Sequence, residues 1–127
     1  MKQIEAVIRR EKFPDVDSSL RKIGVGGLTV IEAEGRGRAR DIETVNIRGK
    51  WTFTHEFIHR VIISLVVEDD DVDKVVSTIV ASASTKTVGD GKIFVFPIEK
   101  SIDIGSGERD NDVALDLREP GSSAKSR

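Results

Sequence analysis

The residues best suited to chemistry lie in one short turn, Val88-Gly89-Asp90-Gly91-Lys92. The apolar run at residues 93–97 follows the lysine at once and predicts a buried strand. A glycine-rich turn beside a lysine can offer backbone N–H groups and one cation to a phosphate. Short matches of this kind are also common in ordinary turns, so the motif taken alone favours a plain turn.

Other groups that could carry catalysis or bind a metal do not form a recognisable set. His55 and His59 lie four residues apart, which suits a metal on a helix, but there is no HExxH motif and no obvious third ligand. The run Asp69-Asp70-Asp71 is better explained as negative charge at the start of a helix. A small enzyme remains an alternative, with candidate acid–base residues His55, His59, Asp90 and Glu108, although nothing pairs them. The sequence therefore predicts neither catalytic residues nor a metal site.

Composition narrows the classes of protein. The 127 residues fit one domain, and 38% hydrophobic with 33% charged residues is a globular composition. A net charge of −2 and only 5% aromatic residues argue against a nucleic-acid binder. Cysteine is absent, which excludes disulfides and thiolate chemistry and suits a cytoplasmic protein. No apolar run reaches the roughly 18 residues of a membrane span, so we expect no membrane insertion.

Apolar periodicity predicts the secondary structure. Alternation over residues 2–9 predicts a strand, and apolar runs predict further strands at 28–34, 58–68 and 93–98. Helical spacing predicts helices over residues 13–23 and 72–83. Ile102 and Ile104 are expected to add a short edge strand. The order β-α-β, long loop, β-α-β is typical of an α+β, ferredoxin-like fold, with two helices on one face of an antiparallel sheet. The uncovered face predicts an oligomer.

The long connection over residues 36–57 is the second candidate for function. Loops of this length in a small domain usually carry function, and this one mixes cations with apolar side chains, as a surface for a partner protein does. The candidate partner-binding residues are Arg40, Arg48, Lys50, Trp51 and Phe53. A simpler interpretation is a β-hairpin over residues 45–57 that turns at Arg48-Gly49-Lys50, and the two interpretations are compatible.

Matched along the chain, these segments resemble the PII nitrogen-regulatory signal proteins. The resemblance rests on Met1 to Arg9, Gly24 to Val30, Gly35-Arg36-Gly37-Arg38, Asp69 to Val76, Val88 to Pro97 and Gly107-Glu108-Arg109. It covers residues 1–109 as a PII-like domain, with residues 36–57 as the family's T-loop. Residues 110–127 are left as a C-terminal tail, which we expect to be partly disordered.

The resemblance implies a non-enzymatic homotrimer that binds adenine nucleotides in clefts between subunits. Its T-loop would dock on a target protein, either an ammonium transporter or an enzyme of nitrogen or carbon metabolism. The residues implied in nucleotide binding are Val7, Gly27, Thr29, Gly35, Gly37, Arg38, Ser64, Val66, Val88, Gly89, Asp90, Gly91 and Lys92. The turn at Gly89 to Lys92 then becomes a phosphate site rather than a plain turn.

Departures from the family's pattern narrow the expected ligand. Ala39 stands where members that sense 2-oxoglutarate have a glutamine that helps to hold Mg-ATP, and Arg60 stands where they have a lysine. Asp103 and Gly105 replace two phosphate-binding arginines, so ADP or AMP is expected in preference to Mg-ATP. Arg38 and Arg60 are candidates for a small anionic effector. The chain has no tyrosine, which excludes nucleotidylation of a T-loop tyrosine. The alternatives are an interaction module that senses another small metabolite or anion, such as bicarbonate, and one that has lost nucleotide binding.

Overall fold

The structure is a computed structural model that describes residues 1–36, 43–45, 51–53, 58–110 and 113. For residues 43–45 and 51–53 only the backbone is described, so the side chains of Trp51 and Phe53 lie outside the described part. The sequence-predicted residues outside the described part are Gly37, Arg38, Ala39, Arg40, Arg48, Lys50 and His55, together with most of the C-terminal tail.

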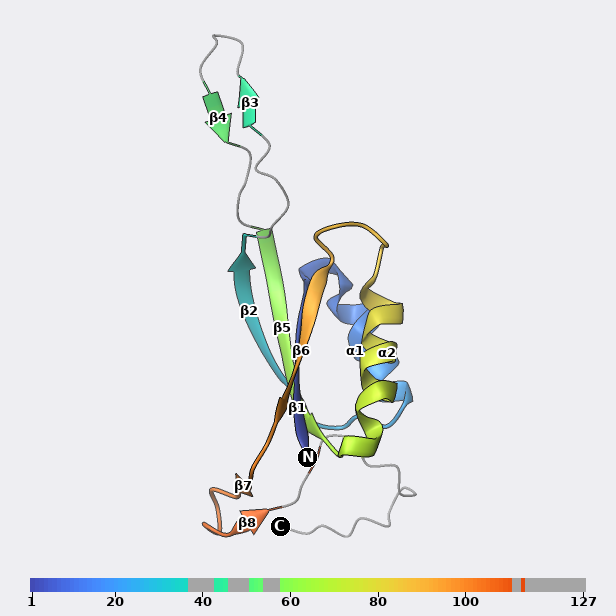
Figure 1. Cartoon of the computed structure of the whole chain (residues 1–127), viewed down its shortest axis with the longest axis vertical. Helices are drawn as coiled ribbons and strands as arrows, with labels where there is room; N and C mark the ends of the chain where they lie inside the picture. The colour runs from blue at the N-terminus through green and yellow to red at the C-terminus, as the bar shows by residue number, and fades with distance from the viewer. Residues whose placement is uncertain (37–42, 46–50, 54–57, 111–112, 114–127) are drawn as a thin grey trace.

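The core of the fold is a four-stranded sheet in the order β2-β5-β1-β6. Its strands are β1 (Lys2–Arg9), β2 (Thr29–Gly35), β5 (Ile58–Val67) and β6 (Gly91–Pro97), and every neighbouring pair is antiparallel. Two helices, α1 (Phe13–Lys22) and α2 (Val72–Ala83), lie side by side on one face (Figure 1). The ferredoxin-like α+β fold predicted from periodicity is confirmed.

The period-2 alternation of the central strands decides which face meets the helices. In β1, Ile4, Ala6 and Ile8 are buried, and their neighbours in sequence are only half-buried. The same alternation buries Val61, Ile63, Leu65 and Val67 of β5 on the helix side. Val16 and Leu20 of α1, and Val75, Ile79 and Ala83 of α2, complete this core. Residues of opposite parity, among them Val7, Arg60 and Ser64, therefore lie on the open face.

Short elements differ in detail from the prediction. Asp69–Asp71 form a 3-10 turn, η2, ahead of α2 and make no side-chain cap; Asp69 Oδ1 instead accepts a hydrogen bond from Lys2 Nζ (3.1 Å). A second 3-10 turn, η1 (Arg10–Lys12), precedes α1. Strands β3 (Glu43–Val45) and β4 (Trp51–Phe53) pair antiparallel, as the hairpin interpretation of the long connection predicts.

The prediction that Ile102 and Ile104 add an edge strand to the sheet is wrong. Only Ser101–Ile102 is a strand, β7, and it pairs with β8 (Arg109–Asp110) rather than with the main sheet. The intervening turn is closed by Asp103, whose N–H donates to Glu108 O (2.9 Å) and whose carbonyl accepts from Gly107 N–H (2.7 Å). This small hairpin stands beyond the end of β6 (Figure 1).

Candidate functional site

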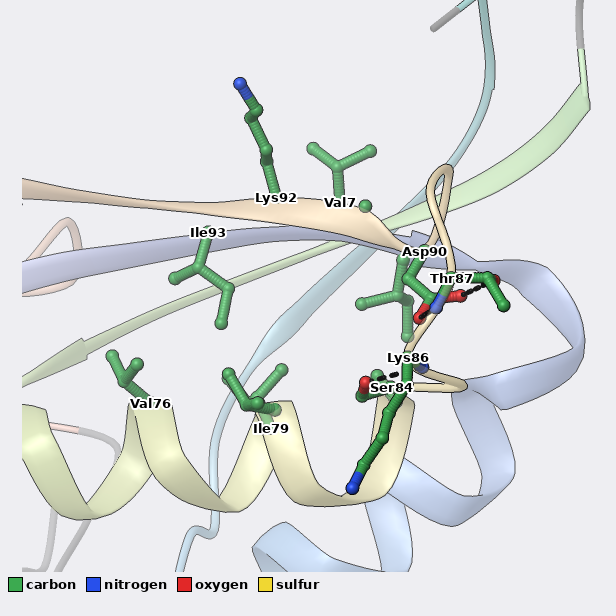
Figure 2. Close-up of a pocket in the computed structure, with 13 residues that line it drawn as sticks. Val7, Val76, Ile79, Ser84, Lys86, Thr87, Asp90, Lys92 and Ile93 are labelled. Atoms are coloured by element: carbon green, nitrogen blue, oxygen red, sulfur yellow. Dashed lines mark hydrogen bonds between the residues drawn. The ribbon is translucent and has the colours of Figure 1, made fainter. Parts of the chain in front are cut away.

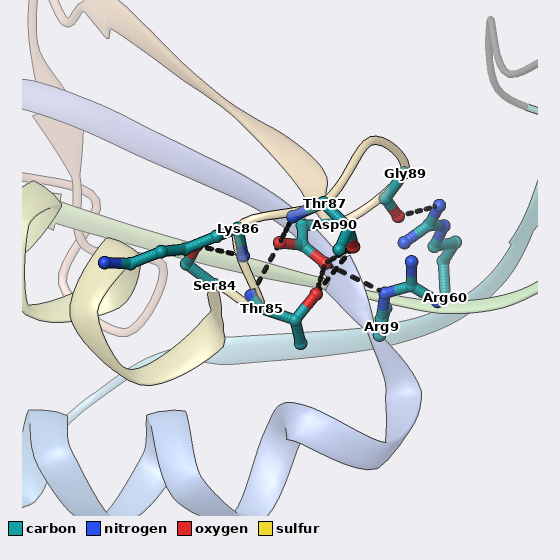
Figure 3. A network of polar contacts seen from close by, with 8 residues as sticks. All are labelled: Arg9, Arg60, Ser84, Thr85, Lys86, Thr87, Gly89 and Asp90. Carbon is teal, nitrogen blue, oxygen red and sulfur yellow. Dashed lines mark hydrogen bonds and ion pairs between the residues drawn. The ribbon is translucent and has the colours of Figure 1, made fainter.

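The turn between α2 and β6 is built around the carboxylate of Asp90. Thr85 donates its N–H to Oδ2 and its hydroxyl to Oδ1, both at 2.6 Å. Thr87 donates its N–H and its hydroxyl to the same carboxylate, both at 3.3 Å, and Arg9 Nε donates to Oδ1 at 3.1 Å (Figure 3). These donors, the Thr85 hydroxyl foremost, hold the pKa of Asp90 well below its usual range. Asp90 thus organises the turn, and its carboxylate is engaged by donors of Thr85, Thr87 and Arg9.

Replacing Asp90 with asparagine is expected to lower the melting temperature at neutral pH, because an amide cannot accept all of these hydrogen bonds. The folded-state pKa is depressed, so the stabilising contribution of Asp90 is present above the unfolded pKa of about 3.9 and is lost as the pH falls below it. Thermal unfolding of both proteins from pH 7 to pH 2 measures this. A gap between their melting temperatures that stays constant with pH would contradict the assignment.

Two arginines hold the turn against the sheet from neighbouring strands. Arg9 of β1 and Arg60 of β5 are directly opposite in register, so both lie on the open face. Arg60 Nη2 donates to Gly89 O at 2.7 Å (Figure 3). Arg60 is only 6% exposed, and its buried Nη1 has no hydrogen-bond partner among the described residues. Burial first, and then the charge of Arg9, lower the pKa of Arg60. A buried guanidinium with a donor to spare is a suitable group for an anion.

Arg60 also lies beside the point where the long connection leaves the sheet. Gly35 is the last residue of β2, and a Cβ built on it would lie 3.4 Å from Arg60 Cγ. The aliphatic part of Arg60 therefore packs on the backbone at Gly35, while its head group reaches Gly89. One side chain connects the base of the T-loop segment with the glycine-rich turn.

Lys92 and Val7 are opposite in register on β6 and β1, and their side chains project to the same side of the sheet (Figure 2). That side is the open face, away from α2. Lys92 is exposed, and Val7 is half-buried beside it. Together with Gly35, Arg60 and Gly89–Gly91, these residues form the first half-site, which combines backbone groups, two cations and an apolar side chain. Val88 of the same turn is exposed.

The remaining predicted residues form a second half-site, farther along the open face. Thr29 and Ser64 are opposite in register on β2 and β5, and Ser64 Oγ accepts a hydrogen bond from Gln3 Nε2 (2.9 Å). Ser64 lies four residues beyond Arg60 on β5, about 13 Å along the strand. Val66 follows on the same strand, and Gly27 precedes β2. One chain thus holds two separate half-sites, an arrangement compatible with a site completed between copies, which stays a prediction.

A pocket of about 390 Å³ lies on the opposite, helix-facing side of β6. Its apolar walls are Val76, Ile79, Val80, Ala83 and Ile93 (Figure 2). Lys86 and Thr87 close the end near the glycine-rich turn. Val7 and Lys92 also belong to its lining, although their side chains project to the other side of the sheet (Figure 2).

The backbone of the turn carries strain at Lys86. Its φ is +63°, a left-handed conformation that costs an L-residue about 1–2 kcal/mol, and its N–H donates to Ser84 Oγ (2.9 Å).

We expect Lys86→Gly to raise the free energy of unfolding by about 0.5–1 kcal/mol, after the greater chain entropy of glycine is subtracted. Urea unfolding measures the difference. Lys86→Ala is the control, since it removes the ammonium but keeps the strained Cβ; equal gains from both variants would contradict the backbone explanation.

The structure also changes how Asp103 is interpreted. Its Oδ2 accepts the Ser106 N–H at 3.0 Å, so the carboxylate helps to form the β7–β8 turn. Sequence analysis identified Asp103 only as the replacement of a phosphate-binding arginine, and the structure shows that it also has this local role in the turn. Positions 103 and 105 still lack the two arginines of the family's pattern.

Sequence reasoning missed Arg9, Thr85 and Thr87. The pattern Thr85-Lys86-Thr87, three to five residues before Asp90, was an available signal, because hydroxyl and carboxylate side chains commonly close turns at such spacings. Arg9 ended a predicted strand and gave no signal, since its partner depends on strand register. Within the described residues, no cluster of His, Asp or Glu could hold a metal ion, and no helix is long and apolar enough to cross a membrane.

The fold and the turn together define a ferredoxin-like protein with a glycine-rich turn at the end of its sheet. Residues 1–108 match the family described as nitrogen regulatory protein P-II. The chain is 41% identical over 112 residues to nitrogen regulatory protein P-II of Microchaete diplosiphon, covering 88% of this chain and 98% of that one. It is 44% identical over 108 residues to P-II 2 of Methanothermobacter thermautotrophicus, covering 85% and 92% of the two chains. It is 42% identical over 111 residues to P-II 1 of Escherichia coli K12, covering 87% and 97%.

The chain therefore belongs to the nitrogen regulatory protein P-II family, as its resemblance predicted. Proteins of this family are signal transducers and not enzymes, which sets aside the small-enzyme alternative.

Proposed function

We propose that this P-II protein is a cytoplasmic homotrimer that binds an adenine nucleotide between its subunits and controls a target protein through its T-loop. The observation that supports this most is the first half-site. There the glycine-rich turn is fixed by Asp90, and Lys92 projects beside it on the open face. Arg60 presents a buried donor that no other residue in the described part of the chain engages. A rigid turn flanked by cations binds phosphate without first having to be ordered.

The charges of the half-site favour a nucleotide with few phosphates. Arg9 is already paired with Asp90, which leaves Lys92 and the spare donor of Arg60 as the cations of the described part of the site. Each missing charge-assisted contact removes about 1.5–3 kcal/mol of binding free energy. ADP or AMP is therefore the expected ligand in preference to Mg-ATP.

The target would be an ammonium transporter or an enzyme of nitrogen or carbon metabolism. It would be contacted by Arg40, Arg48, Lys50, Trp51 and Phe53, and Arg38 at the base of the loop would meet the ligand. Arg60 touches both the turn and Gly35, so a ligand that engages Arg60 acts directly on the base of the T-loop. Occupancy of the site would shift the population of T-loop conformations, and one of these would fit the target.

Calorimetric titration tests the ligand. The purified protein is titrated with ATP, ADP and AMP, each with and without Mg²⁺ and 2-oxoglutarate. Binding of ADP or AMP that is tighter than that of Mg-ATP supports the proposal. Tight Mg-ATP binding that strengthens with 2-oxoglutarate would overturn the interpretation of Ala39, Asp103 and Gly105.

A second candidate function is a module that senses a small anion such as bicarbonate. The spare Nη1 of Arg60 favours it, because a small planar anion could satisfy that donor without a nucleoside. Titration with bicarbonate in the same calorimetric experiment separates the two. Heat from bicarbonate with none from any nucleotide would favour the second function, and no heat from either would leave an interaction module without a ligand.

Removing the lysine of the turn should weaken binding without unfolding the protein. Lys92→Ala is expected to reduce ADP affinity about tenfold or more, since a charge-assisted contact to phosphate is lost. The thermal unfolding curve should not change, because Lys92 is exposed. Lys22→Ala, at the exposed end of α1, is the control of equal charge. An affinity of Lys92→Ala equal to that of Lys22→Ala would remove Lys92 from the site.

A further inference from the structure

Lys86 occupies a backbone position that a lysine fits poorly. Its φ of +63° is left-handed, and a glycine would adopt this conformation without strain. Strained residues of this kind cluster at sites where the protein binds a ligand. No described residue pairs with the ammonium of Lys86, and the side chain lines the pocket between α2 and β6, the α2–β6 pocket. These observations point to a role for the cation other than the stability of the turn.

The α2–β6 pocket exists because α2 leaves the edge of the sheet uncovered. α2 packs over β1, and β6 lies beyond β1 as an edge strand. On the helix-facing side of β6, Gly91 contributes no side chain, Ile93 is half-buried, and Val95 is 44% exposed. Val76 and Val80 of α2 form the facing wall, and Val80 is 50% exposed. An apolar cavity of about 390 Å³ is within the size range of small-molecule sites.

The polar groups of this pocket gather at one end, where α2 passes into the glycine-rich turn. Ser84, Lys86, Thr87 and Asp90 line that end. The carboxylate of Asp90 is ion-paired with Arg9, which leaves Lys86 as the unpaired charge on the helix-facing side among the described residues of the pocket. The head group of Lys86 lies beside the last turn of α2, at the rim of the pocket (Figure 2). A helix C-terminus carries partial negative charge, so without this cation that end of the pocket would repel an acid.

An apolar cleft with a cation at one end is complementary to an amphipathic acid. The cleft and its continuation along β6, from Gly91 to Val95, extend about 13 Å. An alkyl tail that lies along this surface is removed from water, which favours binding. The carboxylate at the end of the tail can then pair with Lys86 in a charge-assisted contact.

We propose that the α2–β6 pocket binds a medium-chain carboxylic acid, with the alkyl tail against Val80 and Ile93 and the carboxylate on Lys86. The site lies on the helix-facing side of β6, whereas Lys92 of the first half-site projects to the other side (Figure 2). The acid is therefore a ligand in addition to the proposed nucleotide. Its binding does not depend on whether a nucleotide binds.

Equilibrium dialysis with radiolabelled octanoate measures this binding directly. We expect saturable binding to the full-length protein, equal with and without excess ADP, because the two sites lie on opposite sides of the sheet. Acetate lacks the tail and 1-octanol lacks the carboxylate, so each should compete at least about tenfold less well than unlabelled octanoate. The absence of saturable binding, displacement by ADP, or equal competition by 1-octanol would each overturn the proposal.

Lys86→Ala tests the role of the cation. The variant removes the ammonium but leaves the turn with a Cβ, and it should weaken octanoate binding about tenfold through the loss of a charge-assisted contact. Lys74→Ala, at an exposed lysine near the start of α2, is the control of equal charge. An octanoate affinity of Lys86→Ala equal to that of Lys74→Ala would contradict the assignment of Lys86.

Val80→Asp tests the position of the tail. An aspartate in the apolar wall should weaken octanoate binding about tenfold or more, because the ligand would bury or repel the new charge. Ala81→Asp adds the same charge at the next, exposed residue of the helix and is the control. Circular dichroism of both variants reports the fold, and Lys86→Ala tests the site independently of it. Equal affinities of the two aspartate variants would place the acid elsewhere and overturn the proposal. ADP titration of the same samples scores the proposed function separately.

Discussion

Gly91→Ala is expected to destabilise the protein by more than about 4 kcal/mol, a large part of the 5–15 kcal/mol that holds a typical domain together. Gly91 has φ +128°, which an L-residue rarely adopts. A Cβ at this position would overlap the carbonyl oxygen of Val7 and lie 3.0 Å from its carbonyl carbon. These atoms belong to the backbone of β1, which is paired on both sides, so they cannot move aside without breaking the sheet.

Two other glycines provide matched controls for this prediction. Gly107 has φ +73° but open space around its missing Cβ, so Gly107→Ala should cost only the backbone strain of about 1–2 kcal/mol. Gly27 has no close neighbour and no positive φ, and Gly27→Ala should change stability by less than about 0.5 kcal/mol. Urea unfolding followed by circular dichroism gives the three values. A midpoint for Gly91→Ala equal to that of Gly107→Ala would show that β6 can move away from β1.

The expected result also affects how binding data on this turn should be understood. A variant at Gly91 would lose ligand because the first turn of β6 is displaced, whether or not Gly91 touches a phosphate. Lys92, whose side chain is exposed on the open face, is the informative position for binding. A glycine in a sequence motif of this kind therefore indicates a constraint on the backbone, and it need not indicate contact with a ligand.

The main elements were predictable because their signals are local. Alternation in residues 2–9 and helical spacing in residues 72–83 each require only neighbours in sequence, and both elements occur as predicted. The glycine-rich turn was also predictable in position, since glycine, aspartate and lysine follow one another between a helix and a strand.

Features that depend on register or on a single turn were not predictable. The juxtaposition of Arg9 and Arg60 joins strands 51 positions apart and exists only because β1 pairs with β5 in one particular register. The role of Asp103 in the β7–β8 turn depends on hydrogen bonds between its carboxylate, its backbone and neighbouring residues, and its charge alone did not indicate this role. The family's pattern located the site, while the pairing of strands determined which side chains could act together.

Arg60 itself is expected to give the largest effect on ligand binding. Arg60→Met keeps a side chain that can pack on Gly35, but it removes both the bond to Gly89 O and the spare donor at Nη1. Stability should change by less than about 1 kcal/mol, because the lost hydrogen bond is offset by relief of a buried cation beside Arg9. Affinity for a phosphate-bearing or other small anion should fall between about 10-fold and 100-fold, the loss of one buried charge-assisted contact.

Arg60→Lys distinguishes charge from geometry at this position. A lysine keeps the cation but lacks the planar fork, so it cannot bond Gly89 O with one nitrogen while presenting a second donor to a ligand. If the guanidinium of Arg60 connects the turn and the T-loop base, Arg60→Lys should bind the anion more tightly than Arg60→Met does. It should not restore the wild-type protection of the Gly89 region from hydrogen exchange. Full recovery of both would mean that charge alone suffices. Wild-type anion affinity in Arg60→Met would show instead that the guanidinium is a structural group and that the anion binds elsewhere.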